Sequence, residues 1–263
     1  MQVDKKCVFC GTVKNCGPYL VKVFQNIEKM ATVFKEYAIV LYYDNSSDDT
    51  LQKLKDYQLK NPKLSFYVNQ SPTTPYRTHN IAKGRNYCIE SIRSRYSEFE
   101  YFIMMDCDDV CSSDVNLRVL YKTLMMESQW DAISFNKNSY YDTWALSIFP
   151  LTFSCWHFKD YNAWPKYINK VLRETPKNSL IKCYSAFNGF AIYKLDKFVN
   201  CFYDGRLRID YIPKELLDAN IRKSGPLRIT KDSMEDCEHR FFHYSGILKN
   251  GARIRISPEV VFP

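Results

Sequence analysis

The sequence predicts an α/β protein in which helices flank a mostly parallel central sheet, followed by a more irregular second half. Three observations support this prediction. Apolar runs of strand length alternate with segments of helical periodicity over residues 6–110. Turn-forming or acidic residues follow these runs, as expected where parallel strands end. The chain has 263 residues, of which 46% are hydrophobic and 25% are charged, a balance typical of a globular protein.

The start of the chain is typical of a strand, a helix and a second strand. The apolar run KCVFCGTVKN, residues 6–15, predicts a strand, and Pro18 suits the opening turn of a helix. Apolar residues recur at helical spacing over residues 19–34. The run YAIVLYY, residues 37–43, is rich in aromatic and β-branched residues, which favours a second strand. It ends in the turn-forming cluster DNSSDDT, which begins at Asp44.

The same alternation continues up to an acidic cluster. An amphipathic helix is expected over residues 51–59 and a strand, LSFYVNQ, over residues 64–70. A loop with two prolines separates that strand from a helix over residues 81–96. The buried run YFIMM, residues 101–105, then predicts a strand that ends in Asp106 and its acidic neighbours. In open parallel sheets, ligands bind beyond such carboxyl ends of strands.

The second half of the chain has weaker periodicity. A helix is expected over residues 116–126, and strands over residues 130–137 and 185–194, the latter interrupted by Gly189. Aromatic residues and prolines gather over residues 140–178 without a clear period. There is no internal repeat and no low-complexity linker, so we predict a single domain over residues 1–263.

Composition narrows the class of protein and its compartment. The net charge is +8, but the lysines and arginines are spread among acids along the chain, so we expect no nucleic-acid partner. No run approaches the length of a membrane helix, and the start lacks an apolar signal core, so we predict no transmembrane segment. Cys7 and Cys10 are predicted to be buried free thiols on opposite faces of a strand. The expected location is a reducing compartment, the cytoplasm of a cell or of a virus-infected host.

The clearest candidate for chemistry is the segment MMDCDD. Asp106 and Asp108 are two residues apart, so on an extended chain their side chains point to one side, about 7 Å apart. Carboxylate oxygens in this arrangement suit Mg²⁺ or Mn²⁺, which commonly share their ligands with substrate phosphates. The cation would offset the repulsion between the clustered acids, Asp109 included. The alternative is that one aspartate caps the next helix and the others are solvated.

Several segments together resemble the GT-A fold glycosyltransferases, which use nucleotide-sugar donors and a metal-binding DXD motif. The resemblance extends over most of the chain and is strongest to family 2 members. It is carried by VFCGTVKNC, YYDNSSDDT, KGRN, MMDCDD, NGFAIYK and MEDCEH. YYDNSSDDT, RN, YDTWAL and CEH also resemble the fungal capsule-associated mannosyltransferases, more loosely. The resemblance implies a nucleotide-sugar-binding half over residues 1–115 and an acceptor-side half over residues 116–263.

The resemblance also assigns roles to individual residues. The expected donor-binding residues are Thr12, Val13, Asp44, Arg85 and Asp106. The expected metal ligands are Asp106, Asp108 and a histidine after the MEDCEH segment, for which His243 is the first candidate and His239 the second. Asp44 has a second interpretation as a turn residue, and Arg85 as a helix-surface residue.

Transfer of a sugar with inversion requires a base for the acceptor hydroxyl. The resemblance makes Asp236 the candidate, with Glu235 beside it and Glu238 as a further option. The other interpretation of MEDCEH is the acidic start of a helix, where carboxylates are favourable. Trp144, Trp156 and Trp164 are available as stacking faces for a sugar, although aromatic residues more often fill cores.

The predicted activity is metal-dependent transfer of a sugar from a UDP- or GDP-sugar to a hydroxyl group of a glycan or glycoprotein. The alternatives are a nucleotidyltransferase and a non-catalytic module that binds nucleotide sugars. The first alternative lacks a glycine-rich phosphate loop near the N-terminus, and the intact acid pair argues against the second. A homodimer is left open as the assembly state.

Overall fold

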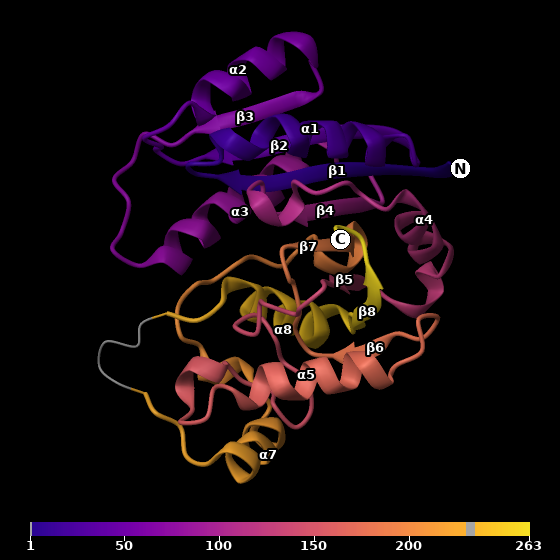
Figure 1. The fold of residues 1–263 in the computed structure, drawn as a ribbon. Coiled ribbons are helices and arrows are strands. Elements are labelled where there is room, and N and C mark those ends of the chain that lie inside the picture. The colour runs from indigo at the N-terminus through magenta and orange to yellow at the C-terminus, as the bar shows by residue number, and fades with distance from the viewer. Residues whose placement is uncertain (1, 230–234) are drawn as a thin grey trace.

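The computed structural model describes residues 2–229 and 235–263 as an α/β fold around one mixed sheet (Figure 1). In the described residues the sheet has eight strands in the order β3-β2-β1-β4-β7-β5-β8-β6. The strands are β1 Val3–Val13, β2 Phe34–Tyr43, β3 Leu64–Val68, β4 Tyr101–Met105, β5 Ala132–Asn136, β6 Ile181–Cys183, β7 Phe190–Lys194 and β8 Ile254–Val260.

The first half of the sheet is parallel and the second half is mixed. β1 pairs in parallel with both β2 and β4, and β2 pairs in parallel with β3. β7 is antiparallel to β4 and to β5, whereas β5 is parallel to β8. β6 closes the far edge, antiparallel to β8. The carboxyl ends of β1, β2 and β4 therefore meet at one edge, as the sequence predicts.

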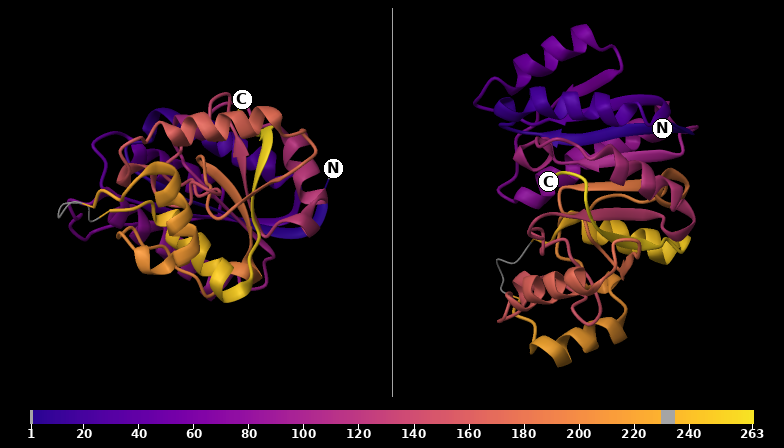
Figure 2. Two further views of the ribbon diagram at one scale, coloured as in Figure 1. Left: turned by 90° about the horizontal axis from the view of Figure 1, so that it is seen from below. Right: turned by 45° about the vertical axis from the view of Figure 1, so that its right-hand side comes forward.

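Helices cover both faces of the sheet. They are α1 Gly17–Ala31, α2 Thr50–Lys60, α3 Arg77–Arg95, α4 Leu117–Met125, α5 Ala163–Glu174, α6 Leu195–Phe198, α7 Lys214–Ser224 and α8 Glu238–Asn250. Apolar residues of α1, α2 and α4 belong to one buried cluster, and those of α3, α5 and α8 belong to the other. α2 and α7 lie at opposite ends of the molecule in Figure 1 and in the right-hand view of Figure 2.

The predicted fold class is confirmed, with differences at boundaries. The helical pattern predicts α1 to continue to Phe34, but α1 ends at Ala31 and Phe34 opens β2, because Phe34 packs in the sheet core. α3 begins four residues earlier than expected, at Arg77. Gly189 does not interrupt β7 but immediately precedes it, with a φ of +84° that favours glycine.

The cysteines behave as buried thiols. All ten are free and buried. Cys7 and Cys10 of β1 belong to different core clusters, which places them on opposite faces of the sheet as predicted. Among the helices described, none combines the length and the apolar character that crossing a membrane requires.

Candidate active site

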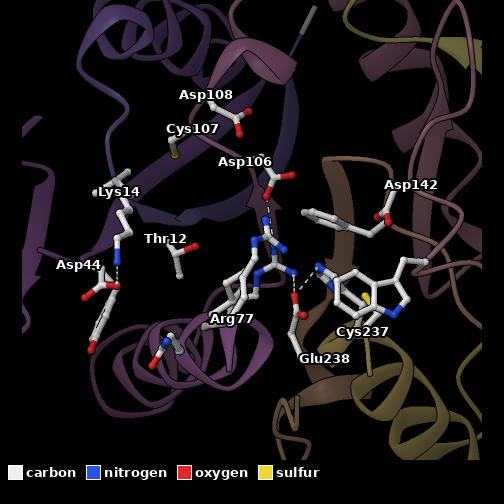
Figure 3. Close-up of a pocket in the computed structure, with 18 of the residues that line it drawn as sticks. Thr12, Lys14, Asp44, Arg77, Asp106, Cys107, Asp108, Asp142, Cys237 and Glu238 are labelled. Atoms are coloured by element: carbon white, nitrogen blue, oxygen red, sulfur yellow. Dashed lines mark hydrogen bonds and ion pairs between the residues drawn. The ribbon is translucent and has the colours of Figure 1, made fainter. Parts of the chain in front are cut away.

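A cleft of about 730 Å³ lies at the edge of the sheet where β1, β2 and β4 end. Its lining includes all five predicted donor-binding residues and both aspartates of the acid pair. In Figure 3, Asp44 and Lys14 lie at one end of the cleft and Asp142 and Cys237 at the other, with Asp106 between them. A volume of this size is typical of a cleft that binds a small-molecule ligand.

Asp44 is fixed at the first end of the cleft. Its carboxylate accepts hydrogen bonds from Lys14 Nζ and from Asn69 Nδ2, each at 3.0 Å. Burial raises the pKa of Asp44, but these hydrogen bonds outweigh burial and hold the pKa below its usual value. The side chain is therefore an ionised acceptor, suited to hydroxyl or N–H donors of a ligand.

Arg85 links the two sides of the cleft. This α3 side chain is only 4% exposed. Its Nη2 lies 3.1 Å from Asp106 Oδ1, and its Nη1 lies 2.5 Å from Glu238 Oε1 at the start of α8. Arg85 is thus neither on the helix surface nor free to leave the site, and one cation holds together residues of β4 and α8.

Gly84 explains how α3 comes so close to the strand ends. A methyl group at this position would lie 2.6 Å from Thr12 Cγ2 and 2.7 Å from Tyr42 Cδ1, both closer than van der Waals contact. Only glycine therefore lets α3 pack against β1 and β2 at this depth. This packing brings the neighbouring Arg85 into the cleft.

Asp106 has the most perturbed carboxyl group of the acid pair. Burial raises its pKa to about 7, the Arg85 cation opposes the rise, and the charges of Asp108, Asp142 and Glu238 add to it. Its Oδ2 lies 3.4 Å from the hydroxyl of Tyr141. Carboxyl groups thus gather at this point of the cleft, and Arg85 offsets only part of their mutual repulsion, so the point suits a further cation.

Asp108 faces the same cleft, and burial also raises its pKa. Its Oδ1 accepts a hydrogen bond of 3.1 Å from Val110 N, so it caps a short 3₁₀ helix, Asp109–Cys111. In residues 2–229 and 235–263, no group of three or more His, Cys, Asp or Glu side chains is arranged to hold a metal. Two hard oxygen donors alone fit Mg²⁺ or Mn²⁺ only when substrate oxygens complete the shell.

Two further carboxylates, Asp142 and Glu238, line the cleft; Asp142 lies at the end opposite Asp44, and Glu238 lies nearer the middle, beside Arg85. Asp142 is fixed by backbone N–H groups, from Ala145 to Oδ1 at 3.1 Å and from Asn188 to Oδ2 at 3.2 Å. Burial raises the pKa of Asp142, and the backbone hydrogen bonds oppose the rise. Glu238 begins α8 and pairs with Arg85.

The structure does not bring Asp236 and Glu235 into this cleft. Asp236 is 4% exposed, and its Oδ2 lies 2.9 Å from Arg240 Nε in a buried ion pair. Glu235 Oε2 accepts hydrogen bonds from the backbone N and the hydroxyl of Thr78, each at 2.7 Å, near the start of α3. Met234, the first residue of the MEDCEH motif, lies outside the described residues. Both carboxylates thus have structural partners elsewhere.

His243, the first histidine candidate for the metal site, lies in the core. Its Nδ1 is 2.9 Å from Ser185 Oγ and its Nε2 is 3.0 Å from the Tyr193 hydroxyl, so both ring nitrogens have partners. Burial lowers its pKa to about 3. The second candidate, His239, does line the cleft, but its ring stacks on Phe187 with centroids 3.7 Å apart.

Sequence reasoning missed several residues of the cleft. Lys14 follows directly on Thr12 and Val13, two expected donor-binding residues, so its position next to them could have indicated that it lines the cleft. Asp142 belongs to YDTWAL, which carried only the loose resemblance. Lining residues to which the sequence assigned no role include Lys14, Tyr42, Arg77 and Asp142. Trp144 and Trp156, two of the three tryptophans expected to be available as stacking faces for a sugar, also line the cleft.

A comparison with a solved structure agrees with this fold. S. aureus TarS 1-349 in complex with UDP matches with a TM-score of 0.50 and 15% identity, covering 98% of this chain and 59% of that chain. The mannosyltransferase PcManGT from Pyrobaculum calidifontis, solved with GDP-Man and Mn²⁺, gives a TM-score of 0.43 and 13% identity, covering 74% and 46%. This chain thus spans less than two thirds of the solved chains it resembles.

A search of curated protein sequences finds no significant match. The model of glycosyl transferase family 2, by contrast, matches residues 10–196. That region runs from within β1 through β7 and contains the acid pair, Arg85 and Asp142. Because this match covers more than half of the chain, the protein belongs to glycosyl transferase family 2.

Proposed function

We propose that this glycosyltransferase moves a sugar from a UDP- or GDP-sugar to a hydroxyl group of an acceptor, with assistance from Mn²⁺ or Mg²⁺. The observation that carries the proposal is the meeting of Asp44, Arg85, Asp106 and Asp108 in one cleft at the carboxyl ends of parallel strands. Such an edge is where open α/β sheets bind nucleotides.

The donor is expected to lie along the first half of the cleft. Asp44 is ionised and suited to accept hydrogen bonds from a ribose or base, beside the backbone of Thr12 and Val13. Asp106 and Asp108 would hold the cation together with the diphosphate. Bound there, the cation would stabilise the negative charge that develops on the leaving diphosphate. Arg85 keeps Asp106 oriented and offsets part of its charge.

Glu238, rather than Asp236, is our proposed catalytic base. Glu238 lines the cleft beside a cation, whereas Asp236 is held in an ion pair outside the cleft. In the reaction, the acceptor oxygen forms a bond to the anomeric carbon as the bond from that carbon to the diphosphate breaks. Glu238 takes the hydroxyl proton. Asp142, whose oxygens both accept backbone N–H groups, orients the loop beside it.

Thermal unfolding with free nucleotides tests donor binding. UDP is the first ligand to try, because the fold-related TarS structure contains UDP, and GDP and CDP follow, each with and without Mn²⁺. A nucleotide at 100 times its dissociation constant should stabilise the protein by about 2.7 kcal/mol. The shift should require both nucleotide and Mn²⁺. If no nucleotide shifts the melting temperature in either condition, the donor site proposed here is wrong.

A further inference from the structure

Two tryptophans meet on the wall of the cleft, and one of them, Trp144, is two residues from Asp142, which lies at the end away from Asp44. The rings of Trp144 and Trp156 have centroids 5.7 Å apart and are inclined at 55°. Both residues line the cleft. Trp156 is 69% exposed, whereas Trp130 and Trp164 are fully buried in the core. An indole this exposed on the wall of a cleft forgoes the burial that large aromatic side chains normally gain.

The exposure of Trp156 does not come from a loosely held loop. Trp156 is the middle residue of a 3₁₀ helix, Cys155–His157, whose first and last residues are both buried. Cys155 Sγ lies 3.6 Å from the carbonyl oxygen of Thr143, and His157 stacks on Phe153 with centroids 5.3 Å apart. The backbone on both sides of Trp156 is therefore fixed, and its ring is presented to the cleft by the fold.

The backbone of Trp144 is held by Arg240, which forms a buried ion pair with Asp236. Arg240 Nη2 donates to the carbonyl oxygen of Trp144, and Nη1 donates to that of Leu146 at 3.1 Å. In the described part of the chain, the buried indole Nε1 of Trp144 and both ring nitrogens of His239 have no hydrogen-bond partner, and His239 Nε2 lies 3.8 Å from Glu238 Oε1. Apolar ring faces and unused polar groups therefore occur together on this wall of the cleft.

This combination matches the chemistry of a sugar ring. A pyranose has a face of C–H groups, which packs on an aromatic ring, and a rim of hydroxyl groups, which need donors and acceptors. The carboxylate of Asp142 lies at the end away from Asp44 and that of Glu238 lies nearer the middle of the cleft, and both line the cleft and supply acceptors. The nucleotide base, by comparison, is expected at the Asp44 end, on the other side of Asp106 (Figure 3).

From these observations we infer that Trp144 and Trp156 form a stacking platform for a pyranose ring of the acceptor, so the acceptor is a carbohydrate and not a protein side chain. The inference rests on the proposed function, because it assigns the second substrate of the same cleft. Trp156 supplies the exposed ring face of the platform. The Trp144 ring, inclined at 55° to it, supplies the second face, and Arg240 holds the backbone of Trp144 in place.

Saturation-transfer NMR on the whole protein tests the platform without requiring the natural acceptor. The probes are the methyl pyranosides of glucose, galactose, mannose and N-acetylglucosamine, the disaccharides cellobiose and chitobiose, and a blocked Ser/Thr peptide. Free UDP, GDP and Mn²⁺ are present, so that no donor sugar competes. The variants are Trp156→Ala, Trp156→Phe and Tyr161→Ala, the last an aromatic residue that is 59% exposed and does not line the cleft.

At least one sugar should receive saturation in the wild type, in Trp156→Phe and in Tyr161→Ala. Trp156→Ala should lower the affinity for that sugar about tenfold, which is the effect expected from the loss of one aromatic contact. Nucleotide affinity, measured by calorimetry, should stay unchanged in Trp156→Ala. Because Trp156 is exposed, its truncation is expected to leave folding intact, and the unchanged nucleotide affinity reports that directly.

The two proposals fail in different ways. If nucleotide binds but no sugar in the panel does, or if sugar binding survives Trp156→Ala, the platform is wrong and the donor site stands. If the Ser/Thr peptide receives saturation that depends on Trp156 and the sugars do not, the acceptor class is wrong. If sugars bind through Trp156 while UDP and GDP never bind, the platform stands and the donor proposal fails.

Discussion

Arg85 and Glu238 are 153 residues apart in the sequence, yet Arg85 Nη1 lies 2.5 Å from Glu238 Oε1. This ion pair joins the parallel half of the sheet, through α3, to the C-terminal helix α8. Both side chains are about 5% exposed, so the pair lies in a region of low dielectric where neither charge is solvated. The geometry of the cleft thus depends on one buried cation.

Removing that cation should destabilise the protein strongly. Arg85→Ala leaves Glu238 and Asp106 without their counter-charge, and breaking a buried pair typically costs about 3–5 kcal/mol. Urea denaturation measures this loss. Arg118→Ala, at an exposed position of α4, is the matched control and should change stability by less than about 0.5 kcal/mol. A loss in Arg85→Ala no larger than in the control would contradict the bridging role.

Glu238→Gln should separate chemistry from binding. The amide keeps the shape of the side chain and an acceptor for Arg85, which also keeps its ion pair with Asp106 at 3.1 Å, but the amide cannot take a proton from a hydroxyl group. We expect kcat to fall by about 10²–10⁴-fold with nucleotide affinity retained. Steady-state kinetics and calorimetry on the same preparation check this. An unchanged kcat would remove Glu238 from the role of base.

Asp236→Asn should act through folding instead. This substitution leaves Arg240 as a buried cation without its partner, and we expect a loss of about 3–5 kcal/mol in the free energy of unfolding. The carbonyl groups of Trp144 and Leu146 that Arg240 contacts would also lose their support. If Asp236→Asn instead keeps its stability and loses only kcat, the family's base is at Asp236 and the proposal for Glu238 falls.

The histidines predict a loss of stability in acid. The pKa of His243 is lowered to about 3 by burial, whereas an unfolded histidine titrates near 6.5. As the pH falls, the unfolded chain therefore binds the proton first. The contribution of neutral His243 to the free energy of unfolding is complete above pH 6.5 and is lost as the pH falls below it. Between pH 6.5 and 5 it amounts to roughly 2 kcal/mol. His157 and His239, whose pKa values are also lowered, act in the same direction.

Comparison of variants isolates the His243 share. Buried acids with raised pKa values, such as Asp106, have the opposite sign, so the wild-type curve alone mixes both effects. Urea denaturation of wild type and His243→Gln at pH 7.5, 6 and 5 gives the difference. The variant should be less stable at pH 7.5 but should lose less on acidification. Parallel curves for the two proteins would show that His243 titrates normally when folded.

The close packing at Gly84 gives a prediction about donor binding. Gly84→Ala places a methyl group against Thr12 and Tyr42, which line the cleft, and overpacking of this kind costs about 1–3 kcal/mol. UDP or GDP affinity should fall along with stability. The control is Gly225→Ala, where φ is +84° and nothing lies within 4 Å, so strain lowers stability while the cleft is untouched. Equal nucleotide affinity in both variants would contradict the packing argument.

Local signals account for what the sequence predicted well. Short apolar runs that end in polar clusters predict the strands β1 to β4 and the acid pair after β4. Each of these signals lies within about ten consecutive residues, so no long-range contact is needed to find it. The sequence pattern does not predict α5, because Pro165 and nearby aromatic residues mask the helical spacing of Trp164, Ile168 and Leu172. Pro165 is in the first turn of α5, where a missing N–H is tolerated.

The acceptor end of the cleft depends on register and long-range packing. Asp236 and Glu238 are two residues apart, and the start of α8 decides that Glu238 lines the cleft while Asp236 pairs with Arg240. Periodicity does not fix the first residue of a helix to within two positions. Trp144 and Trp156 meet only because separate segments fold together, which no single pattern in the sequence encodes.

Asp108→Asn tests the proposed cation site most directly. Asp108 lines the cleft and its Oδ1 accepts a hydrogen bond from Val110 N, which an amide oxygen can also accept, so the fold around the 3₁₀ helix should survive. What the amide loses is negative charge, which a divalent cation requires from its ligands. We expect kcat/KM to fall about a thousandfold, roughly 4 kcal/mol, and the Mn²⁺-dependent part of the nucleotide-induced stabilisation to disappear.

Ser112→Ala, which removes a nearby exposed hydroxyl group, is the control and should retain both the activity and the Mn²⁺-dependent stabilisation. Chelation of metal from the wild type should reproduce the variant, because both remove the same charge interaction. If the variant turns over normally with Mn²⁺, the paired aspartates serve the fold of β4 and its 3₁₀ helix and not a metal.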